Sequence, residues 1–293
     1  MIVKKSLGDH VFDAILSIFM LCVFVVSVYP FLYILNYSIS SVGMIKSPLL
    51  LWPQGVNFDS YRLLLADSTI YRAFFISVLR ATIGPVIMLV VTTMGAYALS
   101  RPNLILGKFF RIYFLFTMYF SAGVIPQYLL MKNLGLTNTF FVYIIPTAVS
   151  AFNMILVKTY IESIPPSLEE AVLIDGGTEI DAFFRVLLRL CLPVNAAVVL
   201  FSCINHWNAF IDAQLYNAMA PRFHTLQYVL YNMLAVQMTQ SLEEAERLSL
   251  VSRVNNQSLK LAITVITIVP IMMVYPFLRK YFVSGLLIGA IKA

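Results

Sequence analysis

Long apolar runs, separated by shorter polar segments, dominate the chain. A helix needs roughly 20 mostly apolar residues to cross about 30 Å of hydrocarbon, and six runs approach or reach that length. Each of them contains or adjoins a proline, which removes a backbone donor and kinks a helix, so bent spans are expected. The pattern predicts an all-α integral membrane protein with six transmembrane helices, at residues 15–37, 75–98, 112–130, 140–156, 194–211 and 261–281.

The composition agrees with an embedded chain. Of its 293 residues, 60% are hydrophobic and 12% are charged, whereas a soluble domain carries about a quarter charged residues. The first apolar run is longer than the core of a typical signal peptide, and no small-residue cleavage site follows it, so a retained anchor is expected. The three cysteines are isolated and form neither a disulfide framework nor a metal-binding pattern.

Lys and Arg residues near the predicted helix ends indicate the orientation of the chain. Such residues are in excess on the cytoplasmic side of a membrane. Six crossings place four groups of them on one side: Lys4 and Lys5; Arg101, Lys108 and Arg111; Lys158, Arg185 and Arg189; Arg279, Lys280 and Lys292. Both termini are therefore expected in the cytoplasm, with the chain in an inner membrane. The same excess accounts for the net charge of +6, so no nucleic-acid partner is expected.

An acidic segment interrupts the apolar pattern after the fourth predicted helix. Six of the 14 acidic residues fall between Glu162 and Asp181. Ser167 is expected to cap a short helix that ends at Ile174, with Glu170 three residues on as its capping-box partner. The sequence Asp-Gly-Gly at 175–177 then predicts a sharp turn, because glycine adopts positive φ angles cheaply.

A second short helix is expected after this turn. Thr178 can cap it, and its apolar face would consist of Ile180, Phe183, Phe184 and Leu187. The segment thus predicts helix, turn and helix between two spans, a shape suited to docking a soluble partner. The alternative is a solvated loop that only balances the charge of the membrane domain.

The residues Glu170-Ala171-Val172-x-x-Asp175-Gly176-Gly177, followed by an apolar stretch and Pro193, resemble the EAA loop of bacterial ABC importer membrane subunits. The usual pattern there is E-A-A-x-x-D-G-A. The resemblance extends over nearly the whole chain, including segments 97–101, 205–210, 275–282 and 289–293. It points to carbohydrate-importer permeases related to the second membrane subunit of maltose transporters, in the branch that handles oligo- and polysaccharides such as alginate.

This chain departs from the usual pattern at three places. Val172 stands where the second alanine is usual, and Gly177 stands where alanine follows Asp-Gly. Leu188-Arg189 replaces the common Leu-Pro. The small residues and the turn survive, so the resemblance still implies that the loop couples the chain to a partner.

The resemblance implies a type I ABC importer fold. An N-terminal anchor and first external loop would cover 1–70, a transmembrane domain 71–282 with its coupling loop at 161–192, and a cytoplasmic tail 283–293. The tail end, 289–293, either reaches the ATPase or is disordered. The coupling residues would be Glu169, Glu170, Ala171, Asp175, Gly176 and Gly177.

The same resemblance implies the partners. They are a second homologous permease subunit, two copies of a cytoplasmic ATP-binding subunit, and a periplasmic or extracellular solute-binding protein. ATP and Mg²⁺ would be bound by the ATP-binding subunits, and this chain would bind no cofactor of its own.

A polar cluster lies inside the fifth predicted helix. Amide, imidazole and indole groups suit sugar hydroxyls, and polar side chains at membrane depth usually face a cavity or the bundle interior. The alternative is contact between helices or subunits. The candidate pathway residues are Asn205, His206, Trp207, Asn208, Asp212 and, in the fourth helix, Asn153.

The sequence lacks the motifs of an enzyme. The phosphate loop G-x-x-x-x-G-K-[ST] is absent, so the chain cannot be the ATPase itself, and no H-E-x-x-H or G-x-S-x-G motif is present. Arg80, near the outer end of the second helix, is expected to snorkel to the surface. The predicted function is the permease subunit of an ATP-driven carbohydrate importer.

Two other classes of protein were compared with this prediction. A stand-alone secondary transporter would need intramembrane ionisable residues and often shows inverted repeats, and the sequence shows neither. A membrane enzyme would need paired carboxylates or histidines facing one cavity, and these are not found.

Overall fold

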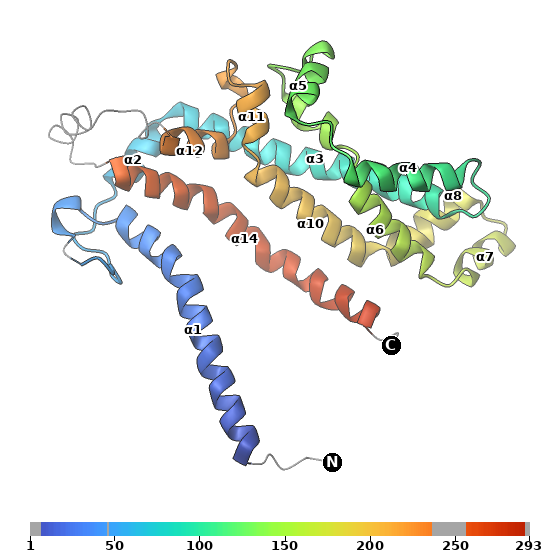
Figure 1. Cartoon of the computed structure of the whole chain (residues 1–293), viewed down its shortest axis with the longest axis horizontal. Coiled ribbons are helices and arrows are strands. Elements are labelled where there is room, and N and C mark those ends of the chain that lie inside the picture. The colour runs from blue at the N-terminus through green and yellow to red at the C-terminus, as the bar shows by residue number, and fades with distance from the viewer. Residues whose placement is uncertain (1–6, 46, 236–255, 291–293) are drawn as a thin grey trace. The chain divides into compact units, whose positions relative to one another are not determined.

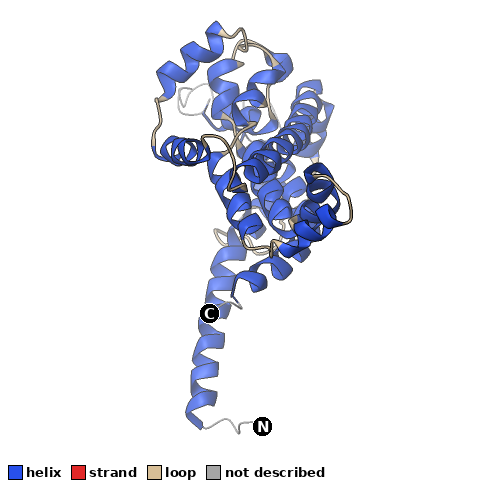
Figure 2. Cartoon of the chain, turned by 90° about the vertical axis from the view of Figure 1, so that its right-hand side faces the viewer, coloured by secondary structure: helices blue, strands red, loops and turns tan. Residues whose placement is uncertain are grey.

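The computed structural model describes residues 7–45, 47–235 and 256–290. These residues form helices joined by turns, as Figures 1 and 2 show. The described part of the chain contains no strand, only an isolated bridge between Ser40 and Val56. The prediction of an all-α protein is confirmed.

Three long helices match three of the predicted spans. They are α1 (Leu7–Ser38), α3 (Ser68–Ser100) and α14 (Asn256–Ala290). Each contains a stretch long and apolar enough to cross a membrane, within residues 8–38, 68–100 and 256–274. Helix α14 carries the backbone to residue 290, and residues 291–293 of the predicted tail lie outside the described part.

The third predicted span is not one helix. Its residues form α4 (Gly107–Tyr119) and α5 (Val124–Asn133), whose axes differ by 116°. The chain turns at Gly123, which has a φ of +84° that glycine adopts most readily. The prediction of a continuous helix over 112–130 is therefore wrong.

The fourth and fifth spans are also broken. The fourth begins with two short 3₁₀ turns, η2 (Phe140–Tyr143) and η3 (Ile145–Thr147), before α6 (Ala151–Glu162) at a bend of 43°. The fifth is α10 (Leu192–Asn208), which is bent by 72° from the preceding helical segment Glu179–Leu190 and is followed by the short α11 (Ile211–Tyr216). If each bent pair counts as one span, the described chain has up to six candidates.

The chain divides into two compact units. The first comprises Met1–Asp67 and Met233–Val269, and the second comprises Ser68–Asn232 and Pro270–Ala293. The domain boundaries expected from the resemblance, at residues 70 and 282, stay a prediction.

Polar contacts organise the described residues of the first unit. The side-chain amide of Asn36 donates to the carbonyls of Leu50 and Leu51, at 3.1 and 2.8 Å, and so ties the loop after α1 back to that helix. The hydroxyls of Ser60 and Ser258, 2.9 Å apart, join the helix α2 (Asp59–Ala66) to α14.

Helices α3, α6 and α10 pack against one another in the second unit (Figure 1). Small and flexible apolar side chains fill the space between them, so the helices approach closely. This core includes Met88, Ala96, Met154, Val157, Leu187 and Val198. The packed helices fix the position of two polar regions, the acidic loop and a cavity beside α10.

Candidate functional site

The acidic loop begins with α7 (Ser167–Ile174). The backbone N–H groups of Glu169 and Glu170 donate to the carbonyl of Pro166, at 3.0 and 3.1 Å. Pro166 occupies the N-cap position, so Ser167 lies in the first turn and its side chain makes no cap bond. The helix is predicted correctly, but the capping box between Ser167 and Glu170 is wrong because the preceding prolines take the cap position.

The turn after α7 depends on two glycines. Gly176 has a φ of +83°, and its N–H donates to the carbonyl of Leu173 at 3.1 Å. The N–H of Gly177 donates to the carbonyl of Val172 at 2.9 Å. A Cβ on residue 177 would lie 2.7 Å from Cγ1 of Val172 and 2.9 Å from its carbonyl oxygen. The backbone conformation requires glycine at 176, and close approach requires it at 177.

Thr178 caps the second half of the loop, as predicted. Its backbone N–H donates to Asp181 at 3.0 Å, and the N–H of Asp181 donates to the Thr178 hydroxyl at 3.3 Å. These hydrogen bonds from Thr178, together with the nearby Arg185 guanidinium, hold the pKa of Asp181 below its ordinary value. These two reciprocal hydrogen bonds form a capping box at the start of α8 (Glu179–Asp181).

The helix continues through a π-helical turn, η4 (Ala182–Leu187), and α9 (Leu188–Leu190). Two residues of the predicted apolar face, Phe183 and Leu187, are buried. The other two are not, since Ile180 is 69% and Phe184 is 55% exposed. Only half of the predicted apolar face therefore packs into this chain, and the other two side chains stay on its surface.

Residues at the end of α3 contact both halves of the loop. Arg101 forms an ion pair with Glu169 at 2.5 Å and lies 4.0 Å over the ring of Tyr97. The Tyr97 hydroxyl donates to the carbonyl of Glu179 at 3.2 Å, and its ring lies 4.8 Å from that of Phe183. The loop is therefore attached to α3 as one piece.

The predicted coupling residues divide between this attachment and the outer surface. Glu169 is turned inward and paired within the chain. Glu170, Ala171, Asp175 and Gly176 are exposed, and apolar side chains lie exposed beside them, with Ile174 at 85%. The outer surface of α7 thus combines a free acidic face with apolar area.

A cavity of about 480 Å³ lies beside the C-terminal end of α10. Asn205 and Asn208 line it from one face of α10, since positions three apart share a helix face, and Asp212 lines it from α11. Gln127 of α5 and Tyr216 of α11 complete its polar lining. Gln127 was not among the predicted pathway residues, because it stands alone in an apolar run and no local pattern marks it.

His206 and Trp207 point elsewhere and do not line this cavity. Both are buried; the imidazole of His206 lies 3.4 Å from the Thr147 hydroxyl and packs directly on Gly84. The Trp207 ring meets that of Phe74 edge to face at 6.1 Å. Their surroundings match the packing alternative. Asn153 is likewise outside the cavity, and its side-chain amide lies 3.7 Å from the sulfur of Met88.

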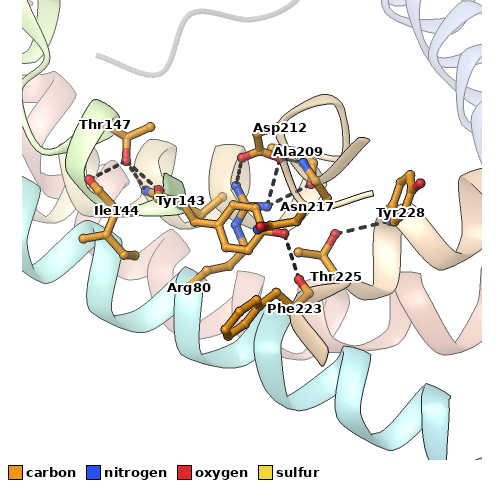
Figure 3. Close-up of polar contacts among 12 residues, drawn as sticks. Arg80, Tyr143, Ile144, Thr147, Ala209, Asp212, Asn217, Phe223, Thr225 and Tyr228 are labelled. Atoms are coloured by element: carbon orange, nitrogen blue, oxygen red, sulfur yellow. Dashed lines mark hydrogen bonds and ion pairs between the residues drawn. The ribbon is translucent and has the colours of Figure 1, made fainter. Parts of the chain in front are cut away.

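Arg80 pairs with Asp212, a residue of the cavity lining, and Figure 3 shows the two side chains pointing toward each other. Arg80 is 1% exposed, and its two terminal nitrogens form an ion pair with the carboxylate of Asp212. One of them also donates to the carbonyl of Ala209 at 3.2 Å, and the guanidinium lies 4.3 Å over the ring of Tyr143. The expectation that Arg80 snorkels is wrong, because it finds a carboxylate and a carbonyl at the break between α10 and α11.

The Arg80–Asp212 pair also corrects a second expectation. No ionisable pair was expected inside the apolar helices. Arg80 and Asp212 lie 132 positions apart in the chain, so no local pattern connects them. The pair joins α3 to α11, and the hydroxyl of Tyr143 donates to the carbonyl of Phe223 at 2.7 Å. The ion pair thus connects Asp212, a residue of the cavity lining, to α3.

Further contacts fix α11 against the preceding loop. The side-chain amide of Asn217 donates to the carbonyl of Thr139 at 3.1 Å, and the N–H of Asn138 donates to that of Tyr216 at 3.0 Å. The ring of Tyr216 stacks on that of Tyr128 in α5, with centroids 6.0 Å apart. Within the described residues, no group of three His, Cys, Asp or Glu side chains could hold a metal ion.

Residues 98–288 match the family model of the binding-protein-dependent transport system inner membrane component. The chain is 33% identical to the polygalacturonan/rhamnogalacturonan transport system permease protein YtcP of Bacillus subtilis, over 97% of this chain and 99% of the relative. It is 34% identical to Protein LplC of the same organism, over 97% and 96%.

A solved structure is also similar. The crystal structure of a bacterial ABC transporter involved in the import of the acidic polysaccharide alginate contains a chain that superposes with a TM-score of 0.86, at 31% identity, covering 95% of this chain and 99% of that one.

The all-helical fold and its apolar spans define a membrane-embedded transport permease. The chain belongs to the family of binding-protein-dependent transport system inner membrane components. The predicted resemblance to ABC importer membrane subunits and the predicted membrane location are confirmed.

Proposed function

We propose that the chain is the permease subunit of an ATP-driven importer of an oligo- or polysaccharide. It crosses the inner membrane six times, with both termini in the cytoplasm, and encloses one pathway together with a second, homologous permease subunit. Two copies of an ATP-binding subunit dock on the cytoplasmic loops and bind ATP and Mg²⁺. An external solute-binding protein delivers the sugar, and this chain holds no cofactor.

The observation that carries the proposal is the attachment of α7. The ion pair between Arg101 and Glu169 holds the inner face of α7 on α3, while Glu170 and its neighbours point outward. A partner that moves α7 therefore moves α3 as well. Glu170 lies in the first turn, where its charge is favoured by the helix dipole and remains available for a basic partner group.

Helix α3 connects the loop to the cavity. About 30 Å of helix separates Arg80 from the end of α3, at about 1.5 Å per residue. A displacement imposed on α7 by ATP binding would reach Arg80 and, through its ion pair, the cavity wall. Closure of the ATP-binding subunits would then shift the bundle between inward- and outward-facing states, a two-state transition biased by nucleotide.

The cargo is proposed from the cavity and from the relatives. The side-chain amides of Gln127, Asn205 and Asn208 both donate and accept hydrogen bonds, as sugar hydroxyls require. Similar proteins are named for polygalacturonan or rhamnogalacturonan, for arabinooligosaccharides, and for melibiose, raffinose and stachyose. Alginate belongs to the same range of candidates through the structural neighbour.

Charge reversal at Glu170 tests the docking role. In the importer purified with its partners, Glu170→Lys is expected to abolish sugar-stimulated ATP hydrolysis and to weaken co-purification of the ATP-binding subunit, with normal membrane insertion. The matched control is Glu162→Lys, an exposed acidic residue whose ion pair with Lys158 stays within α6, and it should retain stimulation. Normal stimulated hydrolysis in Glu170→Lys would refute the docking role.

A stand-alone secondary transporter is the second candidate function. The Arg80–Asp212 pair supports it, since such transporters use intramembrane ionisable groups. If the chain belonged to that class, it would purify from membranes without a bound ATPase and would transport sugar when driven by an ion gradient alone. Sugar uptake that requires ATP and the binding protein would reject it.

A further inference from the structure

The polar lining of the cavity is rich in amides and contains one charged group. Gln127, Asn205 and Asn208 contribute uncharged side chains, and Asp212 contributes a carboxylate. No Lys or Arg side chain lines this cavity within the described part of the chain. The net charge of +6 does not distinguish neutral sugars from uronates, because the membrane orientation accounts for it, whereas the lining of this cavity does distinguish them.

Arg80 neutralises the carboxylate of Asp212 without being available to a ligand. Its side chain is 1% exposed, its terminal nitrogens are engaged with Asp212 and Ala209, and one face lies on the ring of Tyr143. The charge of Arg80 therefore offsets that of Asp212. A sugar carboxylate in the cavity could not reach the guanidinium.

Asp212 keeps part of its acceptor capacity turned toward the cavity. Its side chain is 22% exposed, and one oxygen also accepts the N–H of Ala213 at 2.8 Å. A hydroxyl can donate to the remaining lone pairs of Asp212, whereas an ionised carboxylate has no proton to donate and would leave them unpaired. A sugar carboxylate would also find no cationic partner in the described lining to offset the loss of its hydration.

We infer that this cavity accepts uncharged, hydroxyl-bearing sugar units and disfavours uronates, with Arg80 and Asp212 as the charge-compensated pair that sets this preference. The inference rests on the proposed transport function. It concerns the cavity only, so it is compatible with similarity in sequence and fold to transporters of acidic polysaccharides.

The test compares a matched pair of sugars, a galactose trisaccharide and a galacturonate trisaccharide. Uptake into proteoliposomes is measured for the complete importer with its binding protein saturated by each sugar. The galacturonate-to-galactose uptake ratio of a variant is divided by that of the unmodified importer, so that the selectivity of the shared binding protein cancels.

Gln127 offers a matched pair of substitutions because its side chain is exposed and lines the cavity. Gln127→Lys is expected to raise the uptake ratio on the order of tenfold, and Gln127→Glu to lower it on the order of tenfold. Lys132→Glu, at the end of the same helix and outside the cavity, is the control and should leave the ratio unchanged.

Asp212→Asn is an independent variant, and it should also raise the ratio because the charge of Arg80 is then uncompensated. Ratios that do not respond to Gln127→Lys, Gln127→Glu and Asp212→Asn would overturn the inference. The proposed function fails separately from the cavity preference. It would be overturned, and the inference with it, if the unmodified importer took up neither sugar under any condition and transported no other glycan in an ATP-dependent way.

Discussion

Replacing Gly177 by alanine tests how the turn after α7 is built. The added Cβ would lie 2.7 Å from Cγ1 of Val172 and 2.9 Å from its carbonyl oxygen, where ordinary contacts begin at 3.4 Å. Both neighbours belong to α7, and the carbonyl accepts the N–H of Gly177 itself. The turn must therefore open by several tenths of an ångström to admit one methyl group.

The magnitude follows from the cost of overpacking. Inserting a methyl group where neighbours cannot withdraw freely costs about 1–3 kcal/mol, and part of the strain relaxes because the loop is half-exposed. We expect a local destabilisation of about 1.4 kcal/mol, which corresponds to about tenfold faster opening of the turn.

Hydrogen exchange of the purified importer measures this opening. Peptides covering residues 168–178 should exchange about tenfold faster in Gly177→Ala, while peptides from the first turns of α10 should be unchanged. Val172→Ala in the same chain removes the clashing Cγ1, so the double variant Val172→Ala/Gly177→Ala should recover much of the protection.

Two outcomes would refute this account. One is unchanged exchange in Gly177→Ala, which would mean that the turn already tolerates a side chain. The other is a double variant that exchanges as fast as Gly177→Ala alone, which would mean that Val172 plays no part in the strain.

Three further predictions concern single contacts. Gly176→Val should open the same turn by about 1–2 kcal/mol, because its φ of +83° is unfavourable for a side chain; hydrogen exchange again reports this. Arg80→Leu should lower stability by about 3 kcal/mol by leaving the Asp212 carboxylate unpaired, with partial recovery of the thermal midpoint in Arg80→Leu/Asp212→Leu. The pKa of Asp181 is depressed in the folded loop, so its hydrogen bonds with Thr178 stabilise the loop above pH 3.8, the ordinary pKa value of the group. This stabilisation is lost as pH falls through the lower folded pKa. Pepsin cleavage of the loop should therefore rise below pH of about 4, and Asp181→Asn should not show this rise.

Features encoded by neighbouring residues were predicted well. The apolar lengths of α1, α3 and α14 are continuous in the sequence, and the Thr178 cap involves residues three positions apart. The break at Gly123 was missed because the apolar run continues through it. The Ser167 cap was misplaced because two prolines shift the start of the helix by one residue.

The candidate site was predicted only in part, since it depends on contacts between distant segments. The sequence marked Asn205, Asn208 and Asp212, but it grouped them with His206 and Trp207, which a helix turns to other faces. Arg80 was assigned to the surface, because its partner lies more than one hundred positions away and no local pattern connects them.

The two departures from the usual EAA pattern at Val172 and Gly177 have a common explanation. A larger residue at 172 is matched by the smallest residue at 177, and the two positions lie in contact. Together, the two departures preserve the volume within the turn.

The sharp break between α4 and α5 also bears on what surrounds the protein in the membrane. Residues 120–123 are exposed on this chain, and their backbone is not helical. Peptide groups outside a helix find no hydrogen-bond partner in hydrocarbon, so irregular backbone does not face lipid at membrane depth. Wherever this segment lies at membrane depth, the neighbouring protein or a water-filled space must therefore supply the hydrogen bonds that its backbone lacks.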